Sequence, residues 1–124
     1  MKLTPVLIVE KIETSLPFWV DRMGFQKTVD VPGDDGAAFV ILVRDGAELM
    51  MQTAASAATD APVFAPKGES RITGLFLEVD DFADTVKRLE GYPIAMPERD
   101  TFYGMREVGV FEPSGHIVVF ASRL

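Results

Sequence analysis

The side chains that could do chemistry in this chain are few and widely spaced. There is one histidine, His116, and there is no cysteine, so neither a Ser-His-Asp set nor a Cys-His pair can be assembled. His116 follows a glycine in a turn, which favours a solvated or capping structural role. A lone imidazole that titrates near neutrality could still serve as a base. Gly33 and Gly36 belong to a hairpin turn rather than to the start of a helix, so they do not form a phosphate-binding loop.

The charged side chain with the most suggestive setting is Arg106. It lies two residues after Gly104 in the pattern Tyr-Gly-x-Arg, on a predicted strand with apolar neighbours. A guanidinium there can pair with Glu107 or Glu112, or anchor an anionic group of a ligand. The ion-pair interpretation is the favoured one, and both remain open.

Composition excludes several classes of function. The 124 residues carry a net charge of -7 with scattered Lys and Arg, whereas a nucleic-acid surface needs a clustered basic patch. The chain has neither a signal-peptide pattern nor an apolar run long enough to cross a bilayer. Together with the absence of cysteine, this predicts a cytoplasmic protein with no nucleic-acid or membrane partner.

The elements that must position these side chains follow from apolar periodicity and turn residues. The first half predicts a helix after the first strand, begun by a Thr14 or Ser15 cap and ended at Gly24, with strands over residues 3–9, 25–31, 37–43 and 47–53. The second half predicts a helix over residues 82–90, with strands over residues 72–79, 94–96, 105–111 and 116–121. Residues 54–70 read as a connector that is long for an ordinary loop.

The two halves of the chain resemble each other. Residues 3–24 and 73–91 both run an apolar strand through an acidic hinge into a helix, and residues 48–52 match 117–121. Such repetition predicts architecture before any chemistry is considered. We therefore expect one α+β domain over 1–124, with β-α-β-β-β units at 1–53 and 71–124 joined by the connector at 54–70.

This order of elements, together with the Tyr-Gly-x-Arg pattern at 103–106 and the turn at 112–116, resembles the glyoxalase / bleomycin resistance / extradiol dioxygenase superfamily, also called the vicinal oxygen chelate fold. The resemblance covers nearly the whole chain. It implies two tandem units that form a half-open mixed β-sheet cleft, and a homodimer. Function must still be argued from the site.

Metal-dependent members of that family hold a divalent cation with His, Gln or Glu side chains on the first and last strands of each unit. The resemblance places the four equivalent cleft positions at Thr4, Met50, Gly74 and Val119. None of these side chains suits a cation that prefers nitrogen or carboxylate ligands. Shifting the alignment brings in Glu48 or Gln52, but one oxygen ligand does not make a catalytic metal site. We therefore expect no metal and no other cofactor.

The metal-free branch that the chain resembles best is the bleomycin-resistance type, which sequesters an antibiotic without transforming it. The resemblance brings Phe39 and Tyr103 to aromatic positions of the ligand cleft, where two rings could hold a planar heteroaromatic group. A core role for Phe39 is equally natural. Trp19 is expected in the core, and Met50 in an adaptable pocket. The predicted ligand-binding residues are Phe39, Met50, Gln52, Tyr103 and Arg106.

Three functions remain in competition. The favoured one is a metal-free, non-catalytic protein that binds a small aromatic-containing molecule in a cleft at a dimer interface. The second is a metal-dependent lyase, isomerase or dioxygenase with atypical ligands, or a metal-free enzyme that uses Glu48, Tyr103 or His116 for proton transfer. The third is a scaffold without a ligand, whose cleft is filled by Phe39, Met50 and Val119.

Overall fold

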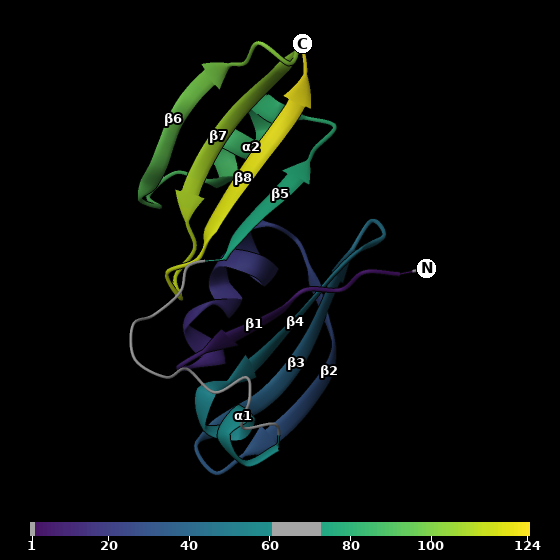
Figure 1. The fold of residues 1–124 in the computed structure, drawn as a ribbon, viewed down its shortest axis with the longest axis vertical. Coiled ribbons are helices and arrows are strands. Elements are labelled where there is room, and N and C mark those ends of the chain that lie inside the picture. The colour runs from purple at the N-terminus through teal and green to yellow at the C-terminus, as the bar shows by residue number, and fades with distance from the viewer. Residues whose placement is uncertain (1, 61–72) are drawn as a thin grey trace. The chain divides into compact units, whose positions relative to one another are not determined.

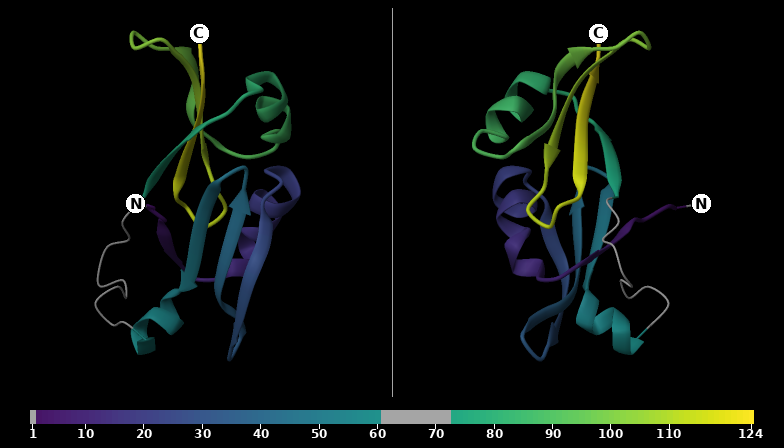
Figure 2. Two further views of the ribbon diagram at one scale, coloured as in Figure 1. Left: turned by 90° about the vertical axis from the view of Figure 1, so that its right-hand side faces the viewer. Right: turned by 60° about the vertical axis from the view of Figure 1, so that its left-hand side comes forward.

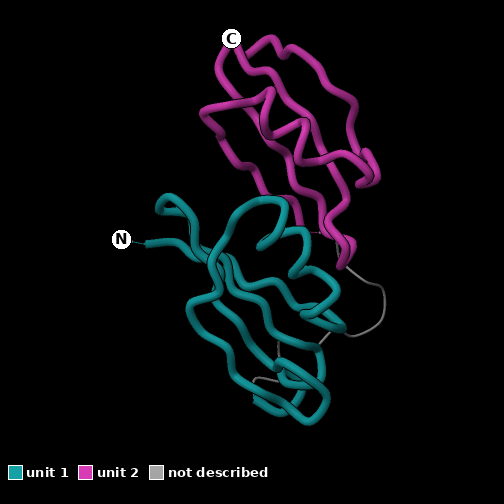
Figure 3. The backbone as a smooth tube through the Cα atoms, turned by 180° about the vertical axis from the view of Figure 1, so that it is seen from behind, with its two compact units in different colours: residues 1–71 teal, residues 72–124 magenta. Residues whose placement is uncertain are grey.

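The structure, a computed structural model, describes residues 2–60 and 73–124. The chain forms two compact units, 1–71 and 72–124 (Figure 3). Each unit contains a four-stranded mixed sheet that does not close on itself. The predicted α+β class with two β-α-β-β-β units is confirmed, whereas a single domain over 1–124 stays a prediction.

The sheet of unit 1 has the strand order β1-β4-β3-β2 (Figure 1). Its strands are β1 (Val6–Val9), β2 (Gln26–Gly33), β3 (Gly36–Arg44) and β4 (Ala47–Thr53). β1 runs parallel to β4 at one edge, and the other pairs are antiparallel. The predicted Asp45-Gly46 turn joins β3 to β4, with φ of 48° and 83° at its two residues. These left-handed values match a two-residue hairpin turn.

Two short helical segments cover one face of this sheet (Figure 2). They are the 3₁₀ segment η1 (Ile12–Thr14) and the π-helical segment η2 (Pro17–Arg22). The predicted core position of Trp19 is confirmed, because its ring is 1% exposed and meets Phe18 and Phe25 edge-on at centroid distances of 5.1 Å. Strand residues on the covered face complete the core with Leu7, Val40, Leu42, Leu49 and Met51.

The predicted cap of this helix is wrong. Leu16 precedes η2 without a side-chain cap, and the buried Ser15 hydroxyl has no hydrogen-bond partner among the residues described. The reason is that η1 runs directly into η2, which places Ser15 at φ -97° and ψ -16°. A capping residue needs extended backbone instead.

The sheet of unit 2 repeats this order as β5-β8-β7-β6. Its strands are β5 (Gly74–Glu78), β6 (Ile94–Asp100), β7 (Met105–Phe111) and β8 (Ile117–Arg123). The helix α2 (Phe82–Arg88) covers one face (Figure 2). Asp81 caps α2, because its Oδ1 accepts the backbone N–H of Asp84 at 2.9 Å. The acidic hinge predicted before this helix is therefore its N-cap.

Two stretches differ from the predicted elements. β6 continues to Asp100 instead of ending at residue 96, with register shifts along its pairing to β7. The strand includes Pro97 and three charged residues after it, so its apolar pattern stops before its pairing does. A seven-residue helix, α1 (Ala54–Asp60), occupies the start of the predicted connector. The remainder of that connector lies outside the described residues.

No helix in the described parts of the chain is long and apolar enough to span a membrane.

Candidate functional site

The face of the first sheet that η1 and η2 leave uncovered is an apolar surface, called here the open face of unit 1. Paired residues of neighbouring strands point to the same side of a sheet, so the strand register defines its members. One row contains Val6, Met50, Ile41 and Val29, and the next contains Ile8, Gln52, Phe39 and Val31. Val6, Val29 and Val31 are 47%, 38% and 46% exposed, and the other five are half-buried. The structure thus brings three predicted ligand-binding residues, Phe39, Met50 and Gln52, onto one face.

A charged cluster borders this face at the Glu48 end of β4. Glu48 Oε1 accepts the hydroxyl proton of Thr4 at 3.0 Å, and its Oε2 accepts from Lys2 Nζ at 2.8 Å. The hydrogen bond from Lys2, followed by the one from Thr4, lowers the pKa of Glu48 below its usual value. Glu48 is therefore an ionised carboxylate at neutral pH, which makes it a weak general base.

The opposite end of the face is bordered by α1. Gln52 Nε2 donates to Ser56 Oγ at 3.2 Å and approaches Asp60 Oδ2 at 3.5 Å. Thr53 caps the helix, since its Oγ1 accepts the Ser56 N–H at 3.1 Å. The amide of Gln52 is thus held from the helix that begins two residues later in the chain.

The uncovered face of the second sheet is the open face of unit 2. Its register places Phe76, Val119, Gly109 and Met96 in one row and Glu78, Ala121, Glu107 and Arg99 in the next. Gly74 lies at the start of β5 beside Ile117. Of the predicted cleft positions, Gly74 and Val119 therefore share this face, whereas Met50 belongs to the open face of unit 1 and Thr4 borders it through Glu48.

Glu107 is a buried carboxylate on the open face of unit 2. It is 1% exposed, yet both of its oxygens have partners: Oε1 accepts the Tyr103 hydroxyl at 2.5 Å, and Oε2 accepts Arg99 Nη2 at 3.1 Å. The hydrogen bond to Glu107 raises the pKa of the Tyr103 phenol and also that of Arg99. Tyr103 therefore stays protonated, and its half-exposed ring is tied to this face by its hydroxyl.

Arg106 lies elsewhere. Its register partners are Asp100 and Ser122, which places it on the other side of the second sheet from Glu107 and Val119. Its guanidinium donates to Asp100 at 2.7 and 3.0 Å, and this carboxylate raises the pKa of Arg106. The ion-pair interpretation is confirmed, but the partner is Asp100 rather than Glu107 or Glu112.

His116 is buried rather than solvated. It is 8% exposed, and its Nδ1 accepts the Thr73 backbone N–H at 3.0 Å. The backbone N–H of His116 approaches Glu112 Oε1 at 3.4 Å. The same oxygen also accepts hydrogen bonds from the backbone N–H and the hydroxyl of Ser114. The capping alternative for His116 is therefore the one that the structure supports, and it ties the 112–116 turn to the residue before β5.

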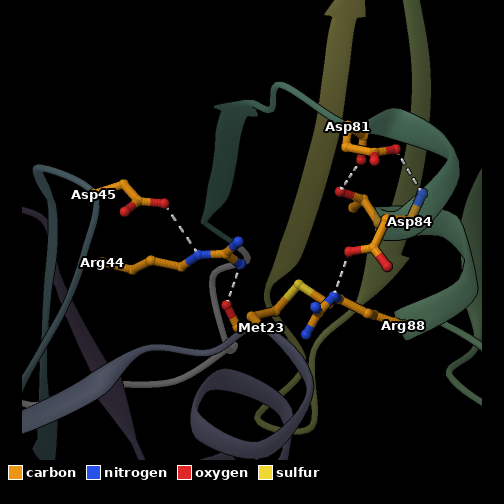
Figure 4. A network of polar contacts seen from close by, with 7 residues as sticks. Met23, Arg44, Asp45, Asp81, Asp84 and Arg88 are labelled. Atoms are coloured by element: carbon orange, nitrogen blue, oxygen red, sulfur yellow. Dashed lines mark hydrogen bonds and ion pairs between the residues drawn. The ribbon is translucent and has the colours of Figure 1, made fainter.

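Other polar contacts hold local structure within each unit (Figure 4). In unit 1, the Arg44 guanidinium donates to the Met23 carbonyl at the end of η2 and pairs with Asp45 at 3.3 Å. In unit 2, Arg88 pairs with Asp84 at 2.7 Å along α2. These contacts join a hairpin to a helix end, or two turns of one helix, and have no evident role in binding.

The comparisons with known proteins are consistent with this geometry. Residues 3–120 match the profile of the Glyoxalase/Bleomycin resistance protein/Dioxygenase superfamily. The chain belongs to this superfamily. No curated protein matches the chain.

Solved structures of superfamily type share the fold at low sequence identity. A glyoxalase/bleomycin resistance protein/dioxygenase from Nocardioides is 19% identical, with a TM-score of 0.79 over 100% of this chain and 84% of its own. TioX from Micromonospora sp. ML1 has the same identity and TM-score and is covered over 99% of its length. A lactoylglutathione lyase from Agrobacterium tumefaciens is 17% identical, with a TM-score of 0.77 over 98% of this chain and 92% of its own. At these identities the similarity shows the fold alone.

The four positions that the resemblance makes equivalent to the superfamily's metal ligands carry no side chain that suits a divalent cation. Thr4 already donates its hydroxyl to Glu48, Met50 offers only a thioether, and Gly74 and Val119 offer no donor atom. Within residues 2–60 and 73–124, no group of three or more His, Cys, Asp or Glu side chains could hold a metal ion. This includes the acidic cavity of about 620 Å³ between the β2–β3 turn and α1.

Sequence reasoning missed the carboxylate of Glu107 as a site residue. A signal was present, because Glu107 shares the strand face of Met105 and Gly109 and lies four residues after Tyr103. It missed Arg99 because the predicted strand ended at residue 96.

Proposed function

We propose that this superfamily member is a metal-independent binding protein for a small, planar, aromatic-containing organic molecule, of the bleomycin-resistance type. The observation that carries the proposal is the open face of unit 1. It presents Phe39 and Met50 as half-buried diagonal neighbours within an apolar surface whose exposed members are three valines. Apolar surface that remains open to solvent is typical of a ligand-binding surface.

The chemistry of the surrounding residues supports binding rather than turnover. Glu48 is tied to Lys2 and Thr4, and Glu107 to Tyr103 and Arg99. A general base needs a pKa near the working pH, whereas the pKa of Glu48 is lowered and that of Tyr103 is raised. Neither group is poised to exchange a proton at neutral pH.

An NMR titration with planar bicyclic probes, indole and quinoline, tests the proposal. Phe39→Leu keeps an apolar side chain but removes the aromatic face, and should weaken binding about twofold to tenfold because a stacked aromatic pair contributes roughly 0.5–1.5 kcal/mol. The matched control is Phe82→Leu at the start of α2, which lies on neither open face and should leave binding unchanged. Equal effects of the two substitutions would refute the assignment of this face.

Elemental analysis of the purified protein addresses the metal. The proposal expects no stoichiometric metal and no effect of chelator on probe binding. About one tightly held Ni, Zn, Mn or Fe per chain, or a chelator-sensitive lyase, isomerase or ring-cleavage activity, would support the enzyme alternative. The proposal includes a homodimer, and light scattering coupled to size-exclusion chromatography tests this by measuring the molar mass in solution.

A further inference from the structure

Gln52 is the polar side chain in the middle of an otherwise apolar row of the open face of unit 1. Its neighbours across β1 and β3 are Ile8 and Phe39. The two branches of its amide differ in chemistry, since Nε2 only donates hydrogen bonds and Oε1 only accepts them. Which branch is turned toward a ligand therefore determines what that ligand must carry.

The contacts with α1 decide this orientation. Nε2 donates to Ser56 Oγ at 3.2 Å and approaches Asp60 Oδ2 at 3.5 Å. An ionised carboxylate can only accept, so Asp60 rejects the flipped amide, in which the two oxygens would face each other. Ser56 alone would tolerate either orientation, because a hydroxyl both donates and accepts.

The other branch of the amide is available. Gln52 Oε1 has no hydrogen-bond partner among the described residues, and it is not one of the buried unpaired atoms, so it is accessible. Thr53 anchors the first turn of α1 by accepting the Ser56 N–H at 3.1 Å. The acceptor is therefore held by a helix that is itself capped from β4.

We propose that Gln52 Oε1 is the specificity-determining acceptor of the open face, and that the ligand is a planar apolar molecule with an N–H or O–H donor on one edge. This inference rests on the proposed function. An apolar ligand that covers this face without such a donor would remove water from Oε1 and leave the acceptor unpaired, which costs affinity. Ser56 and Asp60 act through Gln52 and are positioning residues.

The test compares matched probes that differ only in the donor: indole with 1-methylindole, and 2-quinolinone with 1-methyl-2-quinolinone. NMR titration gives the ratio of the two dissociation constants for each pair. The wild type should bind the N–H member about twofold to tenfold more tightly, the value of one ordinary hydrogen bond. Gln52→Met, which keeps the length of the side chain without its amide, should bring the ratio close to one.

Asp60→Asn tests the positioning step. Asparagine can donate as well as accept, so the Gln52 amide is no longer restricted to one orientation and the ratio should fall. The matched control is Asp34→Asn in the β2–β3 turn, which removes a similar exposed carboxylate and should leave the ratio unchanged. The readout is a ratio, so a general loss of stability would not imitate the effect. Trp19 fluorescence confirms that each variant is folded.

The outcomes distinguish failure of the role of Gln52 from failure of the proposed function. Binding of both members of a pair with equal affinity by the wild type, or a preference that survives Gln52→Met, would overturn the role of Gln52 and leave the proposed function intact. If none of the four probes changed the NMR chemical shifts of Phe39 and Met50, the proposed function and this inference would both be overturned.

Discussion

Met50 and Met51 are adjacent, chemically identical side chains on opposite faces of the first sheet. Met51 is 0% exposed on the face covered by the helical segments, and Met50 is half-buried on the open face. Substituting each by alanine measures what covers each face. The pair therefore distinguishes an open ligand surface from a cleft filled by protein.

The expected magnitudes differ because only one site is enclosed. Met51→Ala removes a fully buried side chain and leaves a cavity, which costs about 3 kcal/mol within a usual range of roughly 2–5. Met50→Ala removes contacts on one side only and leaves no enclosed void, so we expect about 1 kcal/mol or less. With an ordinary urea dependence of the unfolding free energy, Met51→Ala should lower the urea midpoint by about 1–3 M, and Met50→Ala by less than about 1 M.

Urea unfolding followed by Trp19 fluorescence is the appropriate assay, because Trp19 is the only tryptophan and lies in the core of unit 1. In the indole titration the effects should reverse. Met50→Ala should weaken binding, and Met51→Ala should not while the protein remains folded. Equal losses of stability at the two positions, with no effect of Met50→Ala on indole, would refute the open face and favour the filled scaffold.

Three further predictions concern the polar contacts. The raised pKa of Tyr103 means that the folded state holds the phenolic proton more tightly than the unfolded chain, where Tyr titrates near 10.0. Its contribution to stability is complete below that pH and is lost above it. Tyr103→Phe should therefore destabilise the protein at about pH 8 and by less at about pH 10.5. An equal difference in unfolding free energy between wild type and variant at the two pH values would contradict the contact with Glu107. Glu48 has a pKa lowered from 4.5, so its contribution to stability is present above that pH and is lost as the pH falls. Lys2→Met should reduce the loss of stability between about pH 5 and pH 3. The same loss in wild type and variant would contradict the ion pair of Lys2 with Glu48. Asp81→Ala removes the cap of α2 and should cost roughly 0.5–2 kcal/mol in urea unfolding, whereas Asp81→Ser should cost little; equal losses would argue against capping.

Much of the fold could be predicted because strand patterns and turn residues act locally. β4 and β7 have the predicted limits, and the Asp45-Gly46 turn is where its left-handed residues require it. The predicted cap at Ser15 was wrong because the preceding 3₁₀ turn holds Ser15 outside the extended conformation that a cap needs. The limit of β6 failed because pairing with β7 continues through residues without an apolar pattern.

The sequence by itself determined which side chains of one strand share a face, because alternation along a strand has a period of two, and it determined that the two units repeat the same order of elements. The resemblance to the superfamily, rather than alternation, predicted Phe39 and Met50 for one cleft and paired Gly74 with Val119. On that assignment, the positions equivalent to metal ligands carry no suitable donor. Only the tertiary structure decided which polar groups are paired across strands and loops. It turned the Gln52 amide toward Asp60, joined Tyr103 to Glu107, and placed Arg106 with Asp100 on the other side of its sheet. Such pairings depend on register, bulges and helix placement over distances that no local pattern encodes, because each is selected by the burial of the surrounding residues.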